Sequence, residues 1–202
     1  HGQIVIRRSL DEGRTWTQPA SATTGQLTES GEYHTAPMPV VVHEGRLWRA
    51  FEDAMGGTNW GQRYRAIMMS IPVDADLLVR ENWTFSNPLA RNPEWLDGRF
   101  NGWLEGNAVL GPDGAMVNIL RVDTPDCPEK AAIVEVSSDG KELRFSPETG
   151  FIDFPGGAKK FVIRYDPEGG LYWTLATYVE ERHQGTGKPG GIRNTLGLFC
   201  SK

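Results

Sequence analysis

The chain alternates short apolar stretches with turn residues, and this pattern predicts β-hairpins rather than helices. Three segments share one order: a short apolar strand, a turn that contains glycine, and a second strand. They are residues 35–51, 106–122 and 160–178, with the turns H-E-G, P-D-G and P-E-G. Gly, Asp and Pro are the residues that reverse a chain in such turns. We therefore expect three antiparallel hairpins in which Gly45, Gly114 and Gly169 are equivalent.

A third predicted strand follows each hairpin and ends at a serine. These strands are residues 65–70, 131–137 and 194–201, and a fourth copy without a hairpin stands at residues 4–9. The closing serines, Ser9, Ser70, Ser137 and Ser201, are 61, 67 and 64 residues apart. Helical periodicity is poor, and residues 73–80 are the best helix candidate. Four-stranded antiparallel modules repeated in this way are the blades of a β-propeller. The sequence thus predicts an all-β fold, with residues 1–202 forming about three blade-lengths of one incomplete propeller domain.

Composition limits the partners of such a chain. Hydrophobic residues make up 39% and charged residues 23%, as in soluble globular domains. The longest apolar runs are four or five residues, far below the roughly 20 that span a bilayer. The net charge of -5 argues against a general nucleic-acid binder. Neither the histidines and cysteines nor the glycine-rich segments match a metal or nucleotide motif. We therefore expect no membrane span, no nucleic-acid partner, and no metal or cofactor.

The segment S-L-D-E-G-R-T-W, which begins at the first serine, resembles the Asp box of the sialidase and BNR-repeat family. All the marker residues are present: Ser9, Asp11, Gly13, Thr15 and Trp16. Asp11 can accept backbone amide hydrogens across the turn, Gly13 permits a positive φ, and Trp16 can cover the hairpin. The box is structural in that family, and the resemblance implies the same role here. A degenerate copy follows at residues 138–145.

Propeller geometry predicts which residues share a face. In an antiparallel blade, the start of strand one, the end of strand two and the start of strand three lie on one side of the disc. The ligand-contacting candidates on that side are Tyr33, His34, Glu52, Asp53, Trp103 and Asn107. Cationic side chains join them, and we expect Lys159 and Lys160 to form a solvent-exposed rim. An acidic chain that gathers cations and tryptophan on one side is suited to bind an acidic sugar.

The segment from Glu105 to Arg121 resembles part of a sialidase active site. In that family a glutamate opens strand one, a D-G turn follows, and an arginine closes strand two. The resemblance implies that Glu105 is the base toward a nucleophilic tyrosine, that Arg121 is the second arginine of a triad, and that Arg193 is the third. Guanidinium groups bind a carboxylate through two parallel hydrogen bonds. A carboxylate beside a phenol can withdraw its proton, and retaining sialidases use such a tyrosine.

The resemblance also implies parts that these 202 residues do not carry. In the sialidases, the first triad arginine and the acid/base aspartate precede this window, and the tyrosine follows it. We therefore expect further blades, or a second chain, to complete the propeller. The likeness to bacterial proteins of this kind implies a periplasmic, cell-surface or secreted location.

Three functions are compatible with the sequence. The first is a glycoside hydrolase of the sialidase type, acting on terminal sialic acid or another acidic sugar. The second is a catalytically inactive propeller that binds carbohydrate with the same face. The third is a structural or protein-binding propeller segment. Individual residues have alternatives too: Glu105 can serve only as a loop hydrogen-bond acceptor, and Arg63 or Arg65 can take the place of Arg193.

Overall fold

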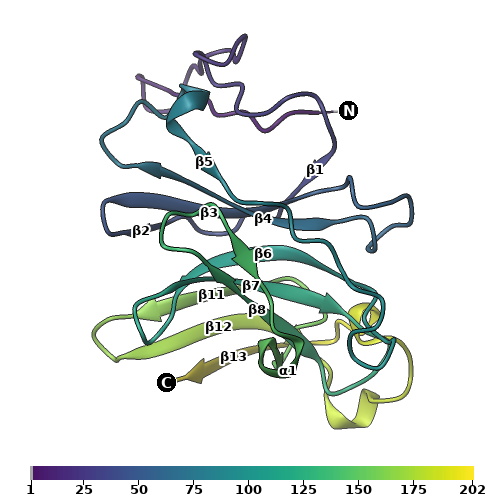
Figure 1. Cartoon of the computed structure of the whole chain (residues 1–202). Helices are drawn as coiled ribbons and strands as arrows, with labels where there is room; N and C mark the ends of the chain where they lie inside the picture. Colours follow the sequence, from purple (N-terminus) through teal and green to yellow (C-terminus); the bar gives the residue numbers. More distant parts are fainter. Residues whose placement is uncertain (1) are drawn as a thin grey trace.

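The computed structural model describes residues 2–202, which form three antiparallel sheets (Figure 1). Sheet 1 contains β1 (Tyr33–His34), β2 (Val41–His43), β3 (Arg46–Asp53), β4 (Arg65–Pro72) and β5 (Thr84–Phe85). Sheet 2 contains β6 (Gly102–Leu110), β7 (Met116–Asp123), β8 (Lys130–Val136), β9 (Leu143–Arg144) and β10 (Phe151–Asp153). Sheet 3 contains β11 (Phe161–Asp166), β12 (Leu171–Tyr178) and β13 (Thr195–Ser201). The short helix α1 (Pro147–Gly150) precedes β10. The chain is therefore all-β as predicted, and none of these three sheets closes on itself.

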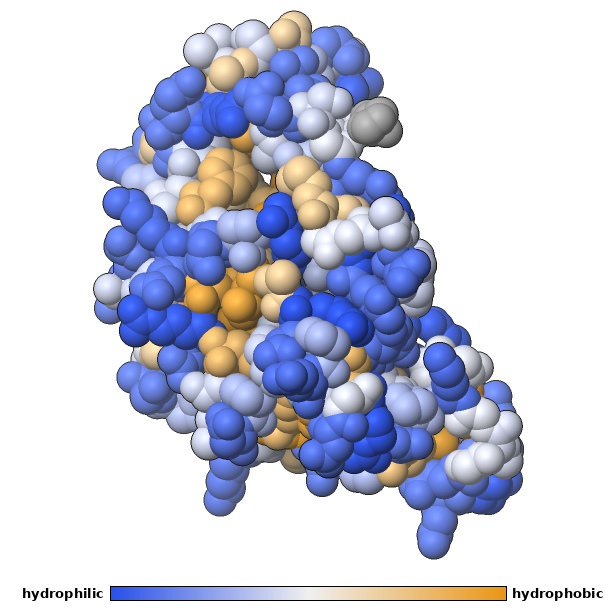
Figure 2. Space-filling model, turned by 45° about the vertical axis from the view of Figure 1, so that its right-hand side comes forward, coloured by the Kyte–Doolittle hydropathy of each residue, from blue (hydrophilic) through white to orange (hydrophobic). Residues whose placement is uncertain are grey.

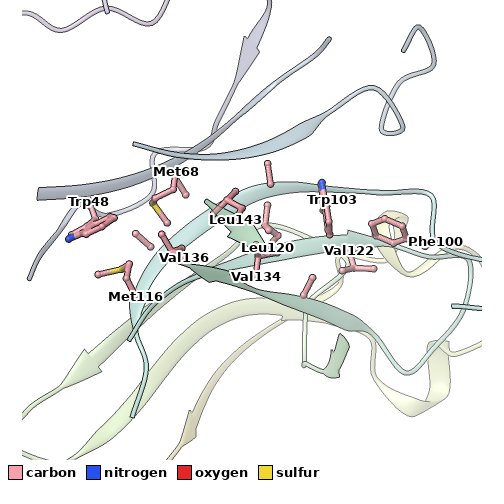
Figure 3. Packing of buried hydrophobic residues seen from close by; sticks show 14 residues of the cluster. Trp48, Met68, Phe100, Trp103, Met116, Leu120, Val122, Val134, Val136 and Leu143 are labelled. Atoms are coloured by element: carbon pink, nitrogen blue, oxygen red, sulfur yellow. The ribbon is translucent and has the colours of Figure 1, made fainter. Parts of the chain in front are cut away.

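The sheets are stacked as successive layers, which Figure 1 shows from top to bottom. One hydrophobic cluster lies between sheets 1 and 2 and contains Trp48, Met68, Trp103 and Leu120 (Figure 3). A second cluster, with Ile119 and Phe161 among its members, lies between sheets 2 and 3. The N-terminal segment covers the remaining face of sheet 1 through residues such as Leu27. Side chains alternate between the two faces of a strand, so each sheet contributes side chains to the hydrophobic cluster on one or both of its faces.

The three hairpins and the three strands that follow them are present as predicted. The turn between β2 and β3 has Gly45 at φ +69°, and the turn between β6 and β7 has Gly114 at φ +82°. In the third hairpin the left-handed residue is Gly170, at φ +64°. The predicted equivalence of Gly169 is therefore wrong by one residue, because the amide of Gly170 closes the turn on the carbonyl of Asp166.

The first strand of sheet 1 is interrupted. His34 in β1 pairs with Glu52, at the far end of β3, whereas β2 pairs with the near end of β3. Residues 35–40 between them leave the ladder, and two of them, Pro37 and Pro39, have no N–H to donate. Arg49 stands in for the missing strand by donating to the carbonyls of residues 36 and 38.

Two predicted elements are absent from the described part of the chain. Residues 4–9 were expected to be a strand, but they form only an isolated bridge between Val5 and Gln26. Its neighbour is residues 25–28, with which it shares two backbone hydrogen bonds, from the Leu27 amide to the Ile4 carbonyl and from the Ile6 amide to the Gly25 carbonyl. Residues 73–80 were expected to be helical, but residues 73–79 form turns and bends, and only Arg80 belongs to a 3-10 helix, Arg80–Asn82. The Asp76 carboxylate accepts the Leu78 amide at 3.1 Å. A short side chain that bonds nearby backbone in this way competes with helix formation.

The Asp-box segment forms a compact turn held by Asp11. Its carboxylate accepts hydrogen bonds from the backbone N–H of Thr15 at 2.8 Å and from the Thr15 hydroxyl at 2.7 Å. Gly13 has φ +84°, and the Trp16 indole N–H donates to the Gly13 carbonyl at 2.9 Å. The degenerate copy repeats one contact, since the Ser137 hydroxyl donates to Asp139 at 2.7 Å, as the Ser9 hydroxyl does to Asp11 at 2.8 Å. The expected turn geometry is present.

We expect the Asp11 turn to loosen at low pH. The hydrogen bonds from Thr15 hold the pKa of Asp11 at about 2, below its ordinary value of 3.8. Because the pKa is lower in the folded chain, the contribution of this group to stability is complete above about pH 3.8 and is lost as the pH falls through about 2. Carboxyl ¹³C NMR titration should give this value, and Thr15→Val should raise it. The same variant should leave the pKa of Asp139 unchanged; an equal rise there would contradict the assignment.

Hydrophilic side chains dominate the surface seen in Figure 2, and hydrophobic ones emerge in separate places between them. No helix within residues 2–202 is long and apolar enough to cross a membrane. Over the same residues, no three His, Cys, Asp or Glu side chains are grouped so as to hold a metal ion.

Candidate functional site

The candidate site lies where the ends of several strands meet. His34 ends β1, Glu52 is near the end of β3, Glu105 is in the first half of β6, and Arg121 is near the end of β7. The antiparallel register places His34 opposite Glu52 and Arg121 opposite Leu104. The four side chains therefore lie near the ends of their strands, on the same side of the stacked sheets 1 and 2. We call this group, together with Lys160, the Glu105 cluster.

A β-bulge directs the Glu105 side chain. The register between β6 and β7 shifts between Leu104 and Asn107, and Glu105 has φ +58°. This left-handed conformation is uncommon for a residue with a side chain and stores strain of about 1–3 kcal/mol. At Gly106, an added Cβ would lie 2.2 Å from the Asn118 side-chain oxygen, so a larger residue does not fit. The bulge thus depends on glycine and re-aims its neighbour.

Two cations contact the Glu105 carboxylate. Arg121 Nη1 lies 3.2 Å from one oxygen and Lys160 Nζ lies 3.2 Å from the other. Arg121 Nε also donates to the Ala158 carbonyl at 2.8 Å. Glu105 and Arg121 are buried, whereas the Lys160 side chain is 54% exposed. Of the two cations on this one carboxylate, Lys160 is therefore the one that solvent can reach.

A second buried carboxylate, Glu52, adjoins this group. It is 0% exposed, its Oε2 lies 3.2 Å from His34 Nδ1, and its Oε1 accepts the Gly106 amide at 2.8 Å. Burial lowers the pKa of nearby Arg49 and the negative charge of Glu52 raises it. A buried carboxylate requires such partners, because unpaired burial of a charge is costly. Glu52 thereby links His34 to the bulge beside Glu105.

Aromatic side chains line the rim next to His34. The His34 ring is 5.1 Å from that of Tyr64, and Tyr64 packs edge-to-face on Trp60 with 6.3 Å between ring centroids. Tyr64 also packs on Leu104, the residue before Glu105. Trp60 is 60% exposed. Tyr33 and His34 line a cavity of about 310 Å³. An exposed tryptophan offers a flat apolar surface on which a sugar ring can stack.

Two of the predicted residues are placed at the margin of the cluster. Asp53 is buried and accepts two hydrogen bonds from Arg65, at 2.8 and 2.7 Å, and these bonds raise the pKa of Arg65. Arg193 is exposed, and its Nε donates to the Gly190 carbonyl at 3.1 Å. Within residues 2–202, Arg193 makes no ion pair with Glu105. Gly190 itself adjoins the Arg121 guanidinium, since a Cβ at that position would lie 3.5 Å from Nη2.

Two predicted ligand contacts are wrong. Trp103 is 0% exposed and packs on Trp95 and Phe100, so it cannot stack on a sugar. Figure 3 shows Trp103 and Phe100 within the cluster. Strand alternation alone puts Trp103 and Glu105 on one side, but the bulge places them on opposite sides. Asn107 is also 0% exposed, and its side-chain oxygen accepts the Ile163 amide at 3.4 Å. It joins sheet 2 to sheet 3 and is not available to a ligand.

The prediction that Lys159 and Lys160 are both exposed to solvent is wrong for Lys159. Lys160 is exposed, but Lys159 is 0% exposed and forms an ion pair with Glu129. Glu129 also accepts the amides of Gly156 and Val179, at 3.0 and 2.9 Å. The sequence gives no sign of this ion pair. It shows only that the consecutive residues 159 and 160 point to opposite sides, so that one of the two lysines faces inward.

Comparison with known proteins does not add to this geometry. No protein-family model matches the chain, and no curated protein matches it.

Proposed function

We propose that the Glu105 cluster binds the carboxylate of an acidic sugar. The observation that supports this most is the convergence of Arg121 and Lys160 on one carboxylate at the ends of strands. A ligand carboxylate that approached Lys160 would gain a charge-assisted hydrogen bond from the ammonium and could reach Arg121 Nη2 beside Gly190. Trp60, on the neighbouring rim, offers a flat apolar surface for the sugar ring.

We propose that this site belongs to a sialidase-like β-propeller in which the three sheets are consecutive blades. Two features support this arrangement. Each sheet is built around an antiparallel meander of three strands, and each meander packs on the next. The Ser137 turn follows the end of β8 remote from Arg121, which pairs with Ala131 near the start of β8. The Asp-box-like turn and the Glu105 cluster are therefore at opposite ends of sheet 2, as the resemblance implies.

Sialoside hydrolysis is the second candidate function, and the strained conformation of Glu105 favours it. Strained residues concentrate at active sites, where the surrounding structure holds them in place. Over residues 2–202, however, no tyrosine hydroxyl bonds Glu105; that of Tyr64 contacts Arg63, and that of Tyr172 donates to Leu110. Hydrolysis with Glu105 as base therefore requires a nucleophile from another polypeptide segment. Binding requires only the groups described above.

A titration with 3′-sialyllactose tests the binding proposal. We expect the chain to bind this sugar and not neutral lactose, as measured by calorimetry. Lys160→Ala should weaken binding at least about threefold and Arg121→Gln at least about tenfold, the latter equivalent to about 1.4 kcal/mol. Lys141→Ala, a change to an exposed lysine in a turn beyond β8, serves as the matched control and should leave affinity unchanged. Equal binding of lactose and sialyllactose, or no effect of either cluster variant, would contradict the proposal.

A fluorogenic sialoside separates the two functions. Turnover that falls at least about tenfold in Glu105→Gln, about 1.4 kcal/mol of barrier, would support hydrolysis. Binding of sialyllactose without turnover would support recognition alone.

A further inference from the structure

Two of the three residues that precede β11 contact the Glu105 cluster directly. The Ala158 carbonyl accepts the Arg121 Nε–H at 2.8 Å, and Lys160 Nζ lies 3.2 Å from the Glu105 carboxylate. Lys159, between them, is 0% exposed and points to the other side, into the interior. Its side chain therefore lies behind the cluster and does not reach a ligand.

The buried ammonium of Lys159 joins two segments that are far apart in the sequence. It pairs with the Glu129 carboxylate, just before β8, and donates to the Pro189 carbonyl at 3.1 Å. Pro189 is buried and begins the short 3-10 helix Pro189–Gly191, in which the same carbonyl accepts the Ile192 amide at 3.1 Å. Lys159 thus attaches the start of this helix to the body of the molecule.

The 3-10 helix Pro189–Gly191 packs against the Arg121 guanidinium. A Cβ at Gly190 would lie 3.3 Å from the Ala158 carbonyl oxygen and 3.5 Å from Arg121 Nη2. Arg121 Nε and Nη1 donate to Ala158 and Glu105, whereas Nη2 donates to no group within residues 2–202. The helix therefore forms the wall beside the one guanidinium nitrogen that is left for a ligand.

Stability alone does not account for a lysine at this buried position. Replacement of a buried ion pair by neutral side chains of similar volume is often neutral or stabilising. The amides of Gly156 and Val179, which Glu129 accepts, can equally be accepted by the side-chain oxygen of a glutamine. What the Lys159 ammonium adds is a charged donor aimed at the Pro189 carbonyl, and such hydrogen bonds are stronger than neutral ones.

We propose that Lys159 is a positioning residue of the ligand site, whose ammonium holds the 3-10 helix Pro189–Gly191 against Arg121 and thereby sets the affinity for a ligand carboxylate. This role rests on the proposed function, since it concerns the same carboxylate. A guanidinium recognises a carboxylate through a planar fork of donors, so a small displacement of Arg121 or of the wall beside it weakens binding.

Spectra of the ligand-free chain test the positioning independently of sugar binding. Lys159→Met with Glu129→Gln removes both charges and the donor to Pro189, but it keeps an acceptor for the amides of Gly156 and Val179. We expect the ¹⁵N NMR signal of Arg121 Nε–H, identified by its loss in Arg121→Gln, to shift together with the amide signals of residues 190–193. An unchanged Arg121 signal in the folded variant would overturn the proposal.

A double-mutant cycle with 3′-sialyllactose tests whether Lys159 acts through Arg121. The paired change at residues 159 and 129 should weaken binding at least about fivefold in the wild-type chain, but less than about twofold in Arg121→Gln, because coupled residues are not additive. Equal weakening in both backgrounds would show a merely structural role and overturn the proposal. If the wild-type chain binds no sugar, the proposed function fails, and the ligand-free spectra decide the positioning role.

Two further variants separate positioning from loss of stability. Leu143→Ala leaves a cavity at the end of sheet 2 remote from Arg121, and it should lower stability without changing affinity or the Arg121 signal. Gly190→Val keeps the Lys159 pair and crowds Arg121 Nη2, so it should shift the Arg121 signal and weaken binding even if the paired variant fails to fold. Unchanged affinity and spectra in Gly190→Val would contradict the role of this wall.

Discussion

Replacing Glu129 by leucine is expected to lower the free energy of unfolding by about 3–5 kcal/mol, because it leaves a buried ammonium without its counter-ion. The Lys159 side chain is 0% exposed, and its other hydrogen bond is to the Pro189 carbonyl at 3.1 Å. Leucine cannot accept the amides of Gly156 and Val179 either. Urea unfolding followed by circular dichroism measures the loss.

Two controls make this result specific to burial. Asp153→Ala removes the partner of Lys130, whose ion pair is partly exposed, and should cost only about 0–1 kcal/mol. Glu129→Leu combined with Lys159→Met removes both charges and should recover a large part of the loss. A loss below about 1 kcal/mol in Glu129→Leu alone would show that the Lys159 charge is relieved in another way. Since the segment around Gly156 also carries Ala158, the carbonyl partner of Arg121, the same variant should weaken sugar binding.

Trp103→Ala is the second change with a large expected effect, a loss of about 3–5 kcal/mol of unfolding free energy. Its indole lies among aromatic rings, 5.3 Å from Trp95 and 5.4 Å from Phe145, and its removal leaves a cavity between sheets 1 and 2. Trp60→Ala, at a side chain that is 60% exposed, should change stability by less than about 1 kcal/mol.

Sugar binding separates the two tryptophans further. Under conditions where Trp103→Ala remains folded, its affinity for sialyllactose should equal that of the wild type. Trp60→Ala should instead bind more weakly without a change in stability. Thermal unfolding and calorimetry on the same samples provide both values. Weaker binding by a fully folded Trp103→Ala chain would restore Trp103 as a candidate ligand contact.

Much of the fold could be predicted because the determinants are local. Turn residues and apolar alternation define each hairpin, and Gly45 and Gly114 adopt the left-handed φ that those turns require. Strands that pair with few neighbours were harder to predict from the sequence. Residues 4–9 have the composition of a strand, but a strand forms a ladder only where a partner is in register, and composition does not show whether one is present.

The candidate site could be predicted only in part, and the bulge at Glu105 explains why. Sequence spacing brings Glu105 and Arg121 to one strand end, and their side chains do meet there. A bulge reverses the side to which the preceding residues point, so Trp103 was placed wrongly. Long-range ion pairs such as Glu129 with Lys159 join residues 30 positions apart, and spacing along the chain carries no information about them.

The interruption of the first strand of sheet 1 affects how this chain behaves when concentrated. Unpaired strand edges are templates for aggregation, and prolines or charges on an edge prevent a second molecule from adding to it. Here Pro37 and Pro39 offer no amide, and the carbonyls of Ala36 and Met38 are already occupied by Arg49 at 2.7 and 2.6 Å. A foreign strand therefore finds no continuous row of donors and acceptors beside β3. Fibril growth, if induced, should begin at other strand edges, and proline substitution at this one should bring no protection.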